Sequence, residues 1–143
     1  MKKDIINTNS NGKLDGKYET YHDNGQLKKK AAYSNGERHG EYEEYYTTGQ
    51  LSIKTTYSNG KLHGEYEIYY ENGQLLEKGT YSNGKLHGKY EWYYPNGQLS
   101  IKKTCYNGEL HGEYESYHPD GKLKSRCNYD MGIKIGIEET HKL

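Results

Sequence analysis

The stretch that decides the fold reads Tyr81-Ser-Asn-Gly-Lys-Leu-His-Gly88, then Lys89-Tyr-Glu-Trp-Tyr-Tyr94, then Pro95-Asn-Gly-Gln-Leu99. Two Asn-Gly dipeptides flank a segment in which aromatic and charged residues alternate. Asn-Gly is the strongest short signal for a β-hairpin, because both central residues of a type I′ turn need a positive φ angle. The stretch therefore predicts a hairpin, with a second tight turn that leads the chain into the next strand.

The same unit returns along the chain at a constant spacing of 24 residues. Its first Asn-Gly lies at residues 11, 35, 59, 83 and 107, and Met131-Gly132 is in step. Helix is disfavoured by the recurring glycines and by the many tyrosines, which favour strands. We therefore expect an all-β protein, an elongated single-layer antiparallel β-meander of about five to six hairpin repeats of 24 residues.

The period also sets the expected boundaries. Residues 1–10 are expected to form an N-terminal lead-in, and residues 11–143 the repeat array. The expected units lie near 12–35, 36–59, 60–83, 84–107 and 108–131, with a partial unit at 132–143. This division leaves no room for a separate domain.

The composition excludes several classes of protein. The chain holds 20 basic and 20 acidic residues, 18 Tyr, no Phe and only 31% hydrophobic residues, too few for an ordinary globular core. A neutral, aromatic chain is nevertheless unlike a disordered one. No apolar run could span a bilayer, the first residues lack the apolar part of a signal peptide, and two cysteines are too few for a disulfide scaffold. We expect a soluble, cytoplasmic protein in which Cys105 and Cys127 are free thiols.

The strand register follows from treating Asn72-Gly73 as a two-residue turn. The predicted pairs are then Tyr70–Leu75, Tyr69–Leu76, Ile68–Glu77, Glu67–Lys78 and Tyr66–Gly79. The same rule gives further charge pairs in the other repeats: Glu19–Lys30, Glu43–Lys54, Glu91–Lys102 and Glu115–Arg126. If Asn59-Gly60 is also a two-residue turn, Lys54 faces Glu65 as well, and Lys102 faces Glu113. One face of the sheet is thus expected to alternate acidic and basic residues.

The other face is expected to be aromatic and aliphatic. It is richest in the middle repeats, where the predicted register sets Ile53 opposite Tyr66 and places Trp92 and Tyr114 on either side of Ile101. An exposed apolar face of this kind marks an interaction surface. The candidate protein-binding residues are Tyr66, Ile68, Tyr70, Trp92, Tyr94, Ile101 and Tyr114.

The unit Asn-Gly-Lys-Leu-His-Gly-Glu-Tyr-Glu, followed by Tyr-Tyr and Asn-Gly-Gln-Leu, resembles the MORN repeat, and more closely its bacterial variant form. The resemblance covers roughly residues 11–140, with Asp15 and Ile135 in place of the family's His at the two ends. It implies a single-layer β-meander. For small bacterial members it also implies an antitoxin-like role, with a toxin or effector as the protein partner.

Catalytic, metal and cofactor sites are not expected. His39, His63, His87 and His111 lie one repeat apart, about 9.6 Å, which is too far for neighbours to share one zinc ion. The carboxylates each face a basic residue and recur on an open sheet, and no nucleophile or phosphate-loop motif is present. We therefore expect no enzyme activity, no metal and no cofactor.

We therefore expect a non-enzymatic module that binds a protein through its Tyr-rich face. The alternatives are a scaffold that self-associates through the same face, as a homodimer, and a membrane-lipid-binding MORN protein. Pairing of lysines with glutamates argues against nucleic acid and against membrane binding.

Overall fold

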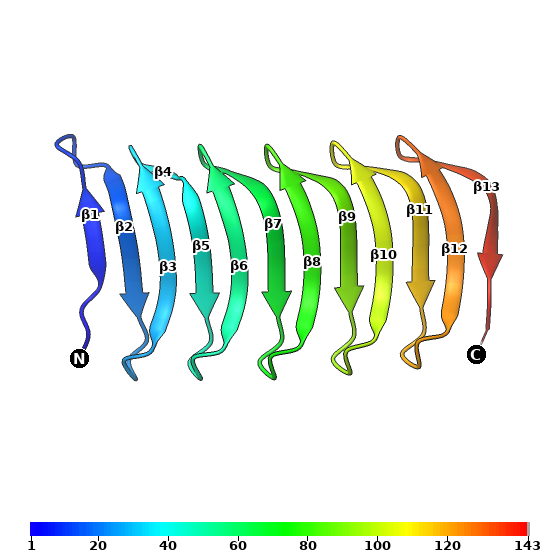
Figure 1. Cartoon of the computed structure of the whole chain (residues 1–143), viewed down its shortest axis with the longest axis horizontal. Helices are drawn as coiled ribbons and strands as arrows, with labels where there is room; N and C mark the ends of the chain where they lie inside the picture. The colour runs from blue at the N-terminus through cyan, green and yellow to red at the C-terminus, as the bar shows by residue number, and fades with distance from the viewer. Residues whose placement is uncertain (143) are drawn as a thin grey trace.

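The computed structural model describes residues 1–142 and folds them into one antiparallel sheet of 13 strands (Figure 1). Consecutive strands are neighbours throughout, except that the two-residue β4 pairs only with β3. The strands are β1 (Ile5–Thr8), β2 (Leu14–Tyr21), β3 (Leu27–Ser34), β4 (Glu37–Arg38), β5 (Gly40–Tyr45), β6 (Leu51–Ser58), β7 (Lys61–Tyr69), β8 (Leu75–Ser82), β9 (Lys85–Tyr93), β10 (Leu99–Tyr106), β11 (Glu109–Tyr117), β12 (Leu123–Asp130) and β13 (Ile133–Thr140).

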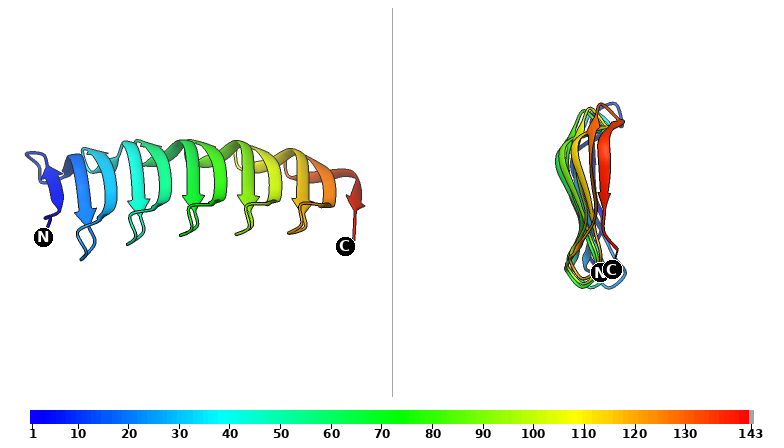
Figure 2. Two further views of the ribbon diagram at one scale, coloured as in Figure 1. Left: turned by 60° about the horizontal axis from the view of Figure 1, so that its bottom comes forward. Right: turned by 90° about the vertical axis from the view of Figure 1, so that its right-hand side faces the viewer.

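The sheet is a single layer that runs the length of the molecule, with the two termini at opposite ends (Figure 1). Seen from its end, the layer is thin and gently bowed, and it does not fold back over either face (Figure 2). Residues 1–142 contain no helix, which confirms the predicted all-β meander. The sheet already begins in the expected lead-in, because β1 pairs with β2.

One of the two turns in each repeat has the predicted geometry. Asn83 and Gly84 have φ angles of 50° and 83°, and the equivalent residues at positions 35–36, 59–60, 107–108 and 131–132 are similar. Asn11-Gly12 is the exception, because only Gly12 has a positive φ there and the Gly12 N–H donates to the Asn9 carbonyl, as in a three-residue loop. Two successive residues in the left-handed region define the type I′ turn that joins β8 to β9. Asn tolerates the left-handed region better than most side chains and Gly suits the second position, which explains why the dipeptide recurs, although Met131 takes the first position in the last turn.

The other turn differs from the prediction. The Gly73 N–H donates to the Tyr70 carbonyl (2.9 Å), and the Tyr70 N–H donates to the Gln74 carbonyl (2.8 Å). The loop therefore has three residues, Glu71, Asn72 and Gly73, and only Gly73 has a positive φ, of 86°. This is a type I turn followed by a left-handed glycine, so the interpretation of Asn72-Gly73 as a two-residue turn is wrong.

The predicted register beyond this turn is nevertheless correct. Ile68 faces Glu77, and Glu67–Lys78 and Tyr66–Gly79 are also paired as expected. Next to the turn, however, Tyr69 faces Leu75, so the predicted pairs Tyr70–Leu75 and Tyr69–Leu76 are wrong. Leu76 is an extra residue in β8, a β-bulge, and it offsets the different loop so that the rest of the two strands meets in the expected register.

A second irregularity follows the type I′ turn. Tyr57 faces Leu62, but Thr55 faces Tyr66, so β7 contains two residues more than β6 between these pairs. The surplus lies around Gly64, whose φ of 112° bends the strand. As a result Lys54 faces Glu67 and not Glu65, and by the same shift Lys102 faces Glu115 and not Glu113.

The two irregularities bring the charges of one face into a single row, here called the charge ladder, which crosses the sheet from β2 to β13. Its members, each facing the next, are Glu19, Lys30, Glu43, Lys54, Glu67, Lys78, Glu91, Lys102, Glu115, Arg126 and Glu139. Acidic and basic residues alternate without exception. The predicted alternation is confirmed, and it is more regular than the predicted pairs implied.

The opposite side, here called the aromatic face, carries Tyr66, Ile68 and their equivalents in the other repeats. Tyrosine rings pack edge to face within a repeat, as Tyr66 and Tyr81 do with ring centroids 5.5 Å apart. The rings lie beside a row of small residues, and those at positions 31, 55, 79 and 127 are buried. Cys127 belongs to this row, and Cys105 takes the place of a tyrosine. Both thiols are free and buried, as predicted.

Candidate functional site

The centre of the aromatic face is a row in which apolar residues are confined to the middle repeats. The members of the row, each facing the next, are Thr20, Lys29, Glu44, Ile53, Ile68, Glu77, Trp92, Ile101, Ser116, Ser125 and Thr140. Two apolar pairs, Ile53–Ile68 and Trp92–Ile101, are separated by Glu77. The expected contact partners change accordingly: Ile53 faces Ile68 and not Tyr66, and Ile101 lies between Trp92 and Ser116, without Tyr114.

The second apolar pair forms the wall of a hollow of about 250 Å³ on the surface. The hollow is lined by Tyr70, Trp92, Tyr93, Tyr94, Ser100 and Ile101. Trp92 is 44% exposed, an unusual state for the largest apolar side chain of the protein. Four of the seven candidate residues therefore meet in one place.

Ser100 is a lining residue that the sequence reasoning missed. It occupies the bulge position of β10, equivalent to Leu76 in β8, between the pairs formed by Leu99 and Ile101. The predicted register contained no bulge, so nothing in it brought Ser100 toward the aromatic side.

Tyr70 and Tyr94 have a structural role in addition to lining the hollow. The Tyr70 hydroxyl donates to the backbone carbonyl of Tyr93 (2.9 Å), and the Tyr94 hydroxyl donates to that of Tyr117 (2.8 Å). Each bond joins the turn of one repeat to the next repeat. The hollow is therefore held on one side by residues that also fix the spacing of the repeats.

The remaining three candidates lie outside the hollow. Tyr66 packs on Tyr81, Ile68 faces Ile53, and Tyr114 packs on Tyr129 with ring centroids 6.2 Å apart. Tyr66 and Tyr114 belong to the packed tyrosine rows and Ile68 to the central row, and together they extend the aromatic face on either side of Trp92.

The fourth repeat, which contains the hollow, departs from its neighbours. Because Cys105 stands at a tyrosine position, the Tyr90 ring has no edge-to-face partner like that of Tyr66. Instead the Lys103 Nζ lies 4.5 Å from the centroid of the Tyr90 ring, a cation–π contact. The pKa of the Tyr90 hydroxyl is raised, chiefly because the group is partly buried and also because Glu77 is negatively charged and hydrogen-bonds to it. A cation and an anion therefore lie beside the apolar hollow, and neither was among the candidate residues.

On the opposite, charged face, tyrosine hydroxyls hydrogen-bond to glutamates of the same strand. The Tyr69 hydroxyl donates to Glu67 on the same strand, and the equivalent tyrosines of the other repeats do the same. Burial and this hydrogen bond raise the pKa of Tyr69 to about 12. The glutamates of the ladder are thus held by tyrosine hydroxyls, and Lys78 adds an ionic contact to Glu67, with Nζ and Oε1 3.7 Å apart.

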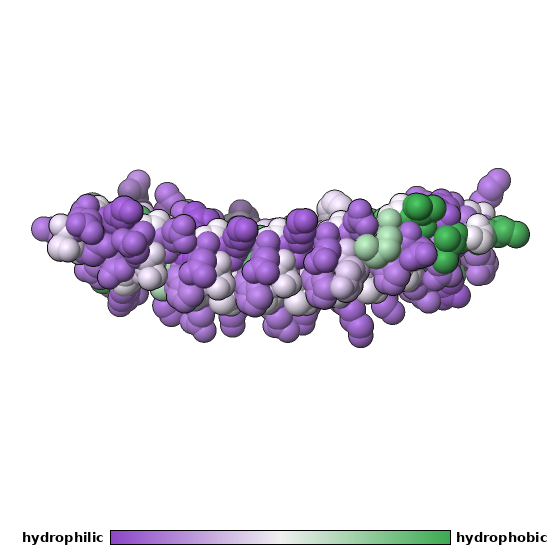
Figure 3. Space-filling model, turned by 90° about the horizontal axis from the view of Figure 1, so that it is seen from above, coloured by the Kyte–Doolittle hydropathy of each residue, from purple (hydrophilic) through white to green (hydrophobic). Residues whose placement is uncertain are grey.

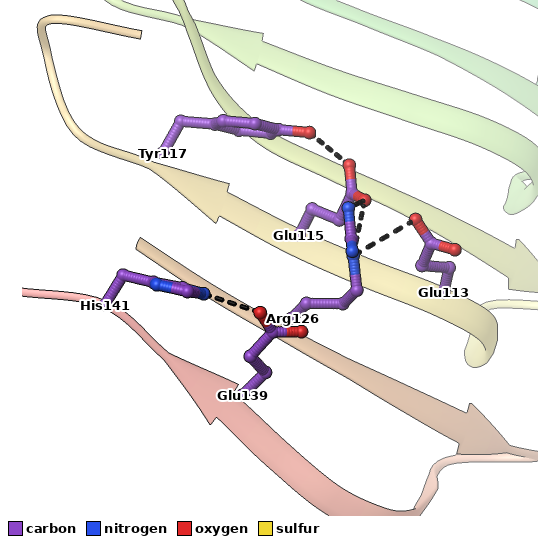
Figure 4. A network of polar contacts seen from close by, with 6 residues as sticks. All are labelled: Glu113, Glu115, Tyr117, Arg126, Glu139 and His141. Atoms are coloured by element: carbon purple, nitrogen blue, oxygen red, sulfur yellow. Dashed lines mark hydrogen bonds and ion pairs between the residues drawn. The ribbon is translucent and has the colours of Figure 1, made fainter. Parts of the chain in front are cut away.

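The shortest ion pair between two residues of the ladder joins Arg126 to Glu115, which is buried (Figure 4). Arg126 Nη2 lies 2.7 Å from Glu115 Oε1, and the Tyr117 hydroxyl donates to the same carboxylate. A hydrogen bond with Glu113 and hydrogen bonds from Tyr117 and Arg126 lower the pKa of Glu115 to about 2, although burial by itself would raise it. Glu115 is therefore held as a carboxylate by Arg126 and Tyr117, side chains of the sheet itself.

The four recurring histidines lie at turns. The Nδ1 atoms of His39, His63, His87 and His111 each accept the backbone N–H of the first turn residue one repeat later, at 3.2, 3.4, 3.3 and 3.3 Å. Asp15 makes the same contact through a carboxylate oxygen, at 2.9 Å. Within residues 1–142 no three His, Cys, Asp or Glu side chains are grouped as metal ligands would be.

A space-filling view shows a largely hydrophilic surface with its strongest apolar patch at one end of the molecule (Figure 3). The exposed large apolar residues of the C-terminal end are Met131, Ile133, Ile135 and Ile137. This patch belongs to β13 and the turn before it, and not to the aromatic face. None of the residues that the structure describes forms a helix able to cross a membrane.

Comparison with protein families gives a match along most of the chain. A model described as "MORN repeat variant" matches five consecutive segments, residues 14–35, 38–59, 62–83, 86–107 and 110–131. The segments keep the 24-residue period and end where the expected units end. A comparison with curated proteins finds no match.

Proposed function

Because this chain belongs to the MORN repeat variant family, we propose that it is a non-enzymatic repeat module that binds a protein partner through its aromatic face. The observation that carries the proposal is the hollow beside Trp92, a residue that is 44% exposed. Protein interfaces are anchored by aromatic side chains that become fully dried, surrounded by a rim that excludes water.

The chemistry around the hollow suits a peptide chain. Trp92 and Ile101 supply apolar contact, and Tyr70 and Tyr94 supply rigid rings. Lys103 and Glu77 flank the apolar residues, so that a partner's polar side chains can be paired at the rim. The binding surface would extend over Ile68 and Tyr66 on one side and reach Tyr114 on the other.

Other classes of function have less support. The glutamates and lysines of the charge ladder alternate, so that no row of unopposed cations is present along the ladder to attract phosphates of lipid or nucleic acid. Carboxylates such as Glu115 are held in hydrogen-bonded networks without an adjacent enclosed substrate site. The family resemblance makes a toxin or effector protein the first partner to test.

The decisive experiment compares the unmodified protein with Trp92→Ala. A partner captured on the immobilised protein is purified and titrated against both forms, with Lys54→Ala, on the charged face, as the control. We expect Trp92→Ala to cost about 2 kcal/mol of binding free energy, as loss of a hot-spot aromatic does. The control should cost well under about 1 kcal/mol, because exposed ion pairs contribute little.

Two results would contradict the proposal. Binding that survives Trp92→Ala but is lost on Lys54→Glu would move the site to the charged face. A dimer, seen by light scattering, that Trp92→Ala dissociates would show that the aromatic face joins two copies of the chain and not a different protein.

A further inference from the structure

The two edges of the sheet differ, and only one of them is a full-length strand. β1 has four residues and changes register within them. β13 has eight residues, all exposed, and no residue within 1–142 pairs with its outer side. Natural proteins protect sheet edges by making them short or irregular, whereas a long open edge is a template for another strand. The C-terminal edge is therefore the one able to accept a strand.

β13 has the backbone geometry of β11, which lies one repeat earlier. Gly136, with φ of 74°, stands where β11 has Gly112, with φ of 99°. On its far side β11 pairs with β12 without a break from Gly112 to Ser116. The 24-residue period maps this stretch onto Gly136–Thr140, so the outer side of β13 offers five successive positions for regular antiparallel pairing.

The charge ladder is incomplete at this edge. Each ladder glutamate from β5 to β11 faces a basic residue on both sides, whereas Glu139 faces only Arg126. Arg126 directs its guanidinium to Glu115, at 2.7 Å, and Glu139 contacts the His141 ring instead, with Nε2 and Oε1 2.6 Å apart (Figure 4). Glu138, the residue before Glu139, points to the other face of the strand and pairs with Lys134, with Oε2 and Nζ 2.7 Å apart, so Glu139 is the ladder carboxylate that this edge presents. An opposite charge on an added strand would complete the ladder.

We propose that Gly136–Thr140 of β13 binds an extended basic segment of a protein partner by strand addition, with a Lys or Arg opposite Glu139. The chain's own strands show such a pairing: in β3, Lys30 faces the ladder residue Glu19 and Tyr33 faces Gly16, three residues further along. Ile137, which is 96% exposed, supplies an apolar contact at the same edge. Backbone hydrogen bonds provide the affinity in this mode of recognition, and side chains opposite the edge provide the specificity.

A second copy of the chain fits this edge less well. Antiparallel pairing of Gly136–Thr140 with itself sets Glu138 opposite Glu138 and Glu139 opposite Ile137, so no basic residue meets Glu139. The other edge of a copy presents Ile5 in the ladder row, as its pairing with Glu19 shows, and β1 itself (Ile5–Thr8) contains no basic residue. The open edge is thus complementary to a basic strand and not to either edge of the protein itself.

The probe for the test is a labelled peptide with the sequence of β3, Leu27–Ser34, titrated against the full chain by fluorescence anisotropy. We expect saturable binding that weakens about fivefold or more when the peptide carries Lys30→Glu, which sets like charges opposite each other. The protein variant Glu139→Lys should reverse the preference between the two peptides. Trp92→Ala should leave the affinity unchanged, which separates this edge from the site proposed on the aromatic face.

Each of the other outcomes overturns the proposal. These are absence of saturable binding, equal affinity for both peptides, loss of binding on Trp92→Ala, and a concentration-dependent dimer that Glu139→Lys dissociates. Circular dichroism checks that Glu139→Lys keeps the sheet. If that variant unfolds, Glu139→Gln replaces it, and the two peptides should then bind with more similar affinities.

Discussion

The Tyr94 hydroxyl donates a hydrogen bond to the backbone carbonyl of Tyr117, 23 positions later in the chain and 2.8 Å away. Tyr46 and Tyr70 make the same bond to the following repeats. Each bond satisfies a carbonyl at the end of a strand, beside a turn, and ties one repeat to the next. In arrays of this kind stability is a sum of such nearest-neighbour contacts.

We expect Tyr94→Phe to destabilise the protein while leaving the ring in the hollow. The variant loses one partly buried hydrogen bond and leaves the Tyr117 carbonyl without its donor, which costs about 1 kcal/mol. Thermal unfolding should show a lower melting temperature. Tyr106→Phe is the matched control, because Tyr106 is 48% exposed, and an equal loss in both variants would argue against the repeat-to-repeat bond.

We expect His87→Asp to retain more stability than His87→Leu. His87 Nδ1 accepts the N–H of Asn107, at 3.3 Å, and Asp15 makes the equivalent contact with Asn35 through a carboxylate, at 2.9 Å. Asp can therefore replace the acceptor, whereas Leu leaves the turn N–H without one, at a cost of about 1 kcal/mol or more. Urea unfolding of the two variants measures the difference, and equal midpoints would contradict the acceptor role.

We expect the sheet to unfold in alkali between about pH 10 and pH 12. Burial and hydrogen bonds to glutamates raise the pKa of Tyr45, Tyr69, Tyr93 and Tyr117 from 10.0 to about 12. A tyrosine whose pKa is higher in the folded than in the unfolded protein stabilises the fold. This contribution is fully present below the pKa of the unfolded state and is lost as the pH rises through the pKa of the folded state.

Tyrosinate absorbance and circular dichroism, recorded together, test this expectation. Ionisation of these tyrosines should coincide with loss of the sheet, and Tyr69→Phe should make the fall in stability less steep. Complete ionisation near pH 10 with the sheet intact would contradict the expectation.

Glu115 should make the stability of the fold depend on pH in the acid range, in the opposite direction to the tyrosines. Its pKa is lowered to about 2, so its contribution is present above the unfolded value of about 4.3 and is lost as the pH falls toward 2. Glu115→Gln should therefore be less stable than the unmodified protein at pH 6, and the gap should narrow at pH 2.5. Urea unfolding at both pH values measures the gap, and a constant gap would show that the carboxylate charge is not the cause.

The fold was predictable because the signals that set it recur in every repeat, but the turns were not all read correctly. The same Asn-Gly dipeptide serves a type I′ turn at Asn83-Gly84 and a three-residue loop at Asn72-Gly73. Pro95 was an available clue: its fixed φ suits the first central position of a type I turn, whereas in a two-residue Asn96-Gly97 turn it would be the flanking residue, which must donate an N–H that Pro lacks.

Among the candidate site residues, Trp92 and Ile101 could be paired from sequence because both lie beyond the irregular positions of their strands. The bulges could not be foreseen, so Ser100 was missed and Ile53 was given the wrong partner. The glycine ladder that contains Gly64 was visible in the sequence, but a glycine within a strand does not reveal how many residues its bulge adds.

The strict alternation of the charge ladder also restricts how the length of this protein can change. Deletion of residues 61–84 removes one period and leaves Lys54 facing Glu91 in place of Glu67, so the row stays alternating and both kinds of turn survive. Deletion within the array of a segment that is not a whole number of periods shifts the register, so that like charges face each other or a strand turns over. The array can therefore lose or gain sequence only in whole repeats. Duplication or deletion of a repeat would give related proteins interaction surfaces of different length.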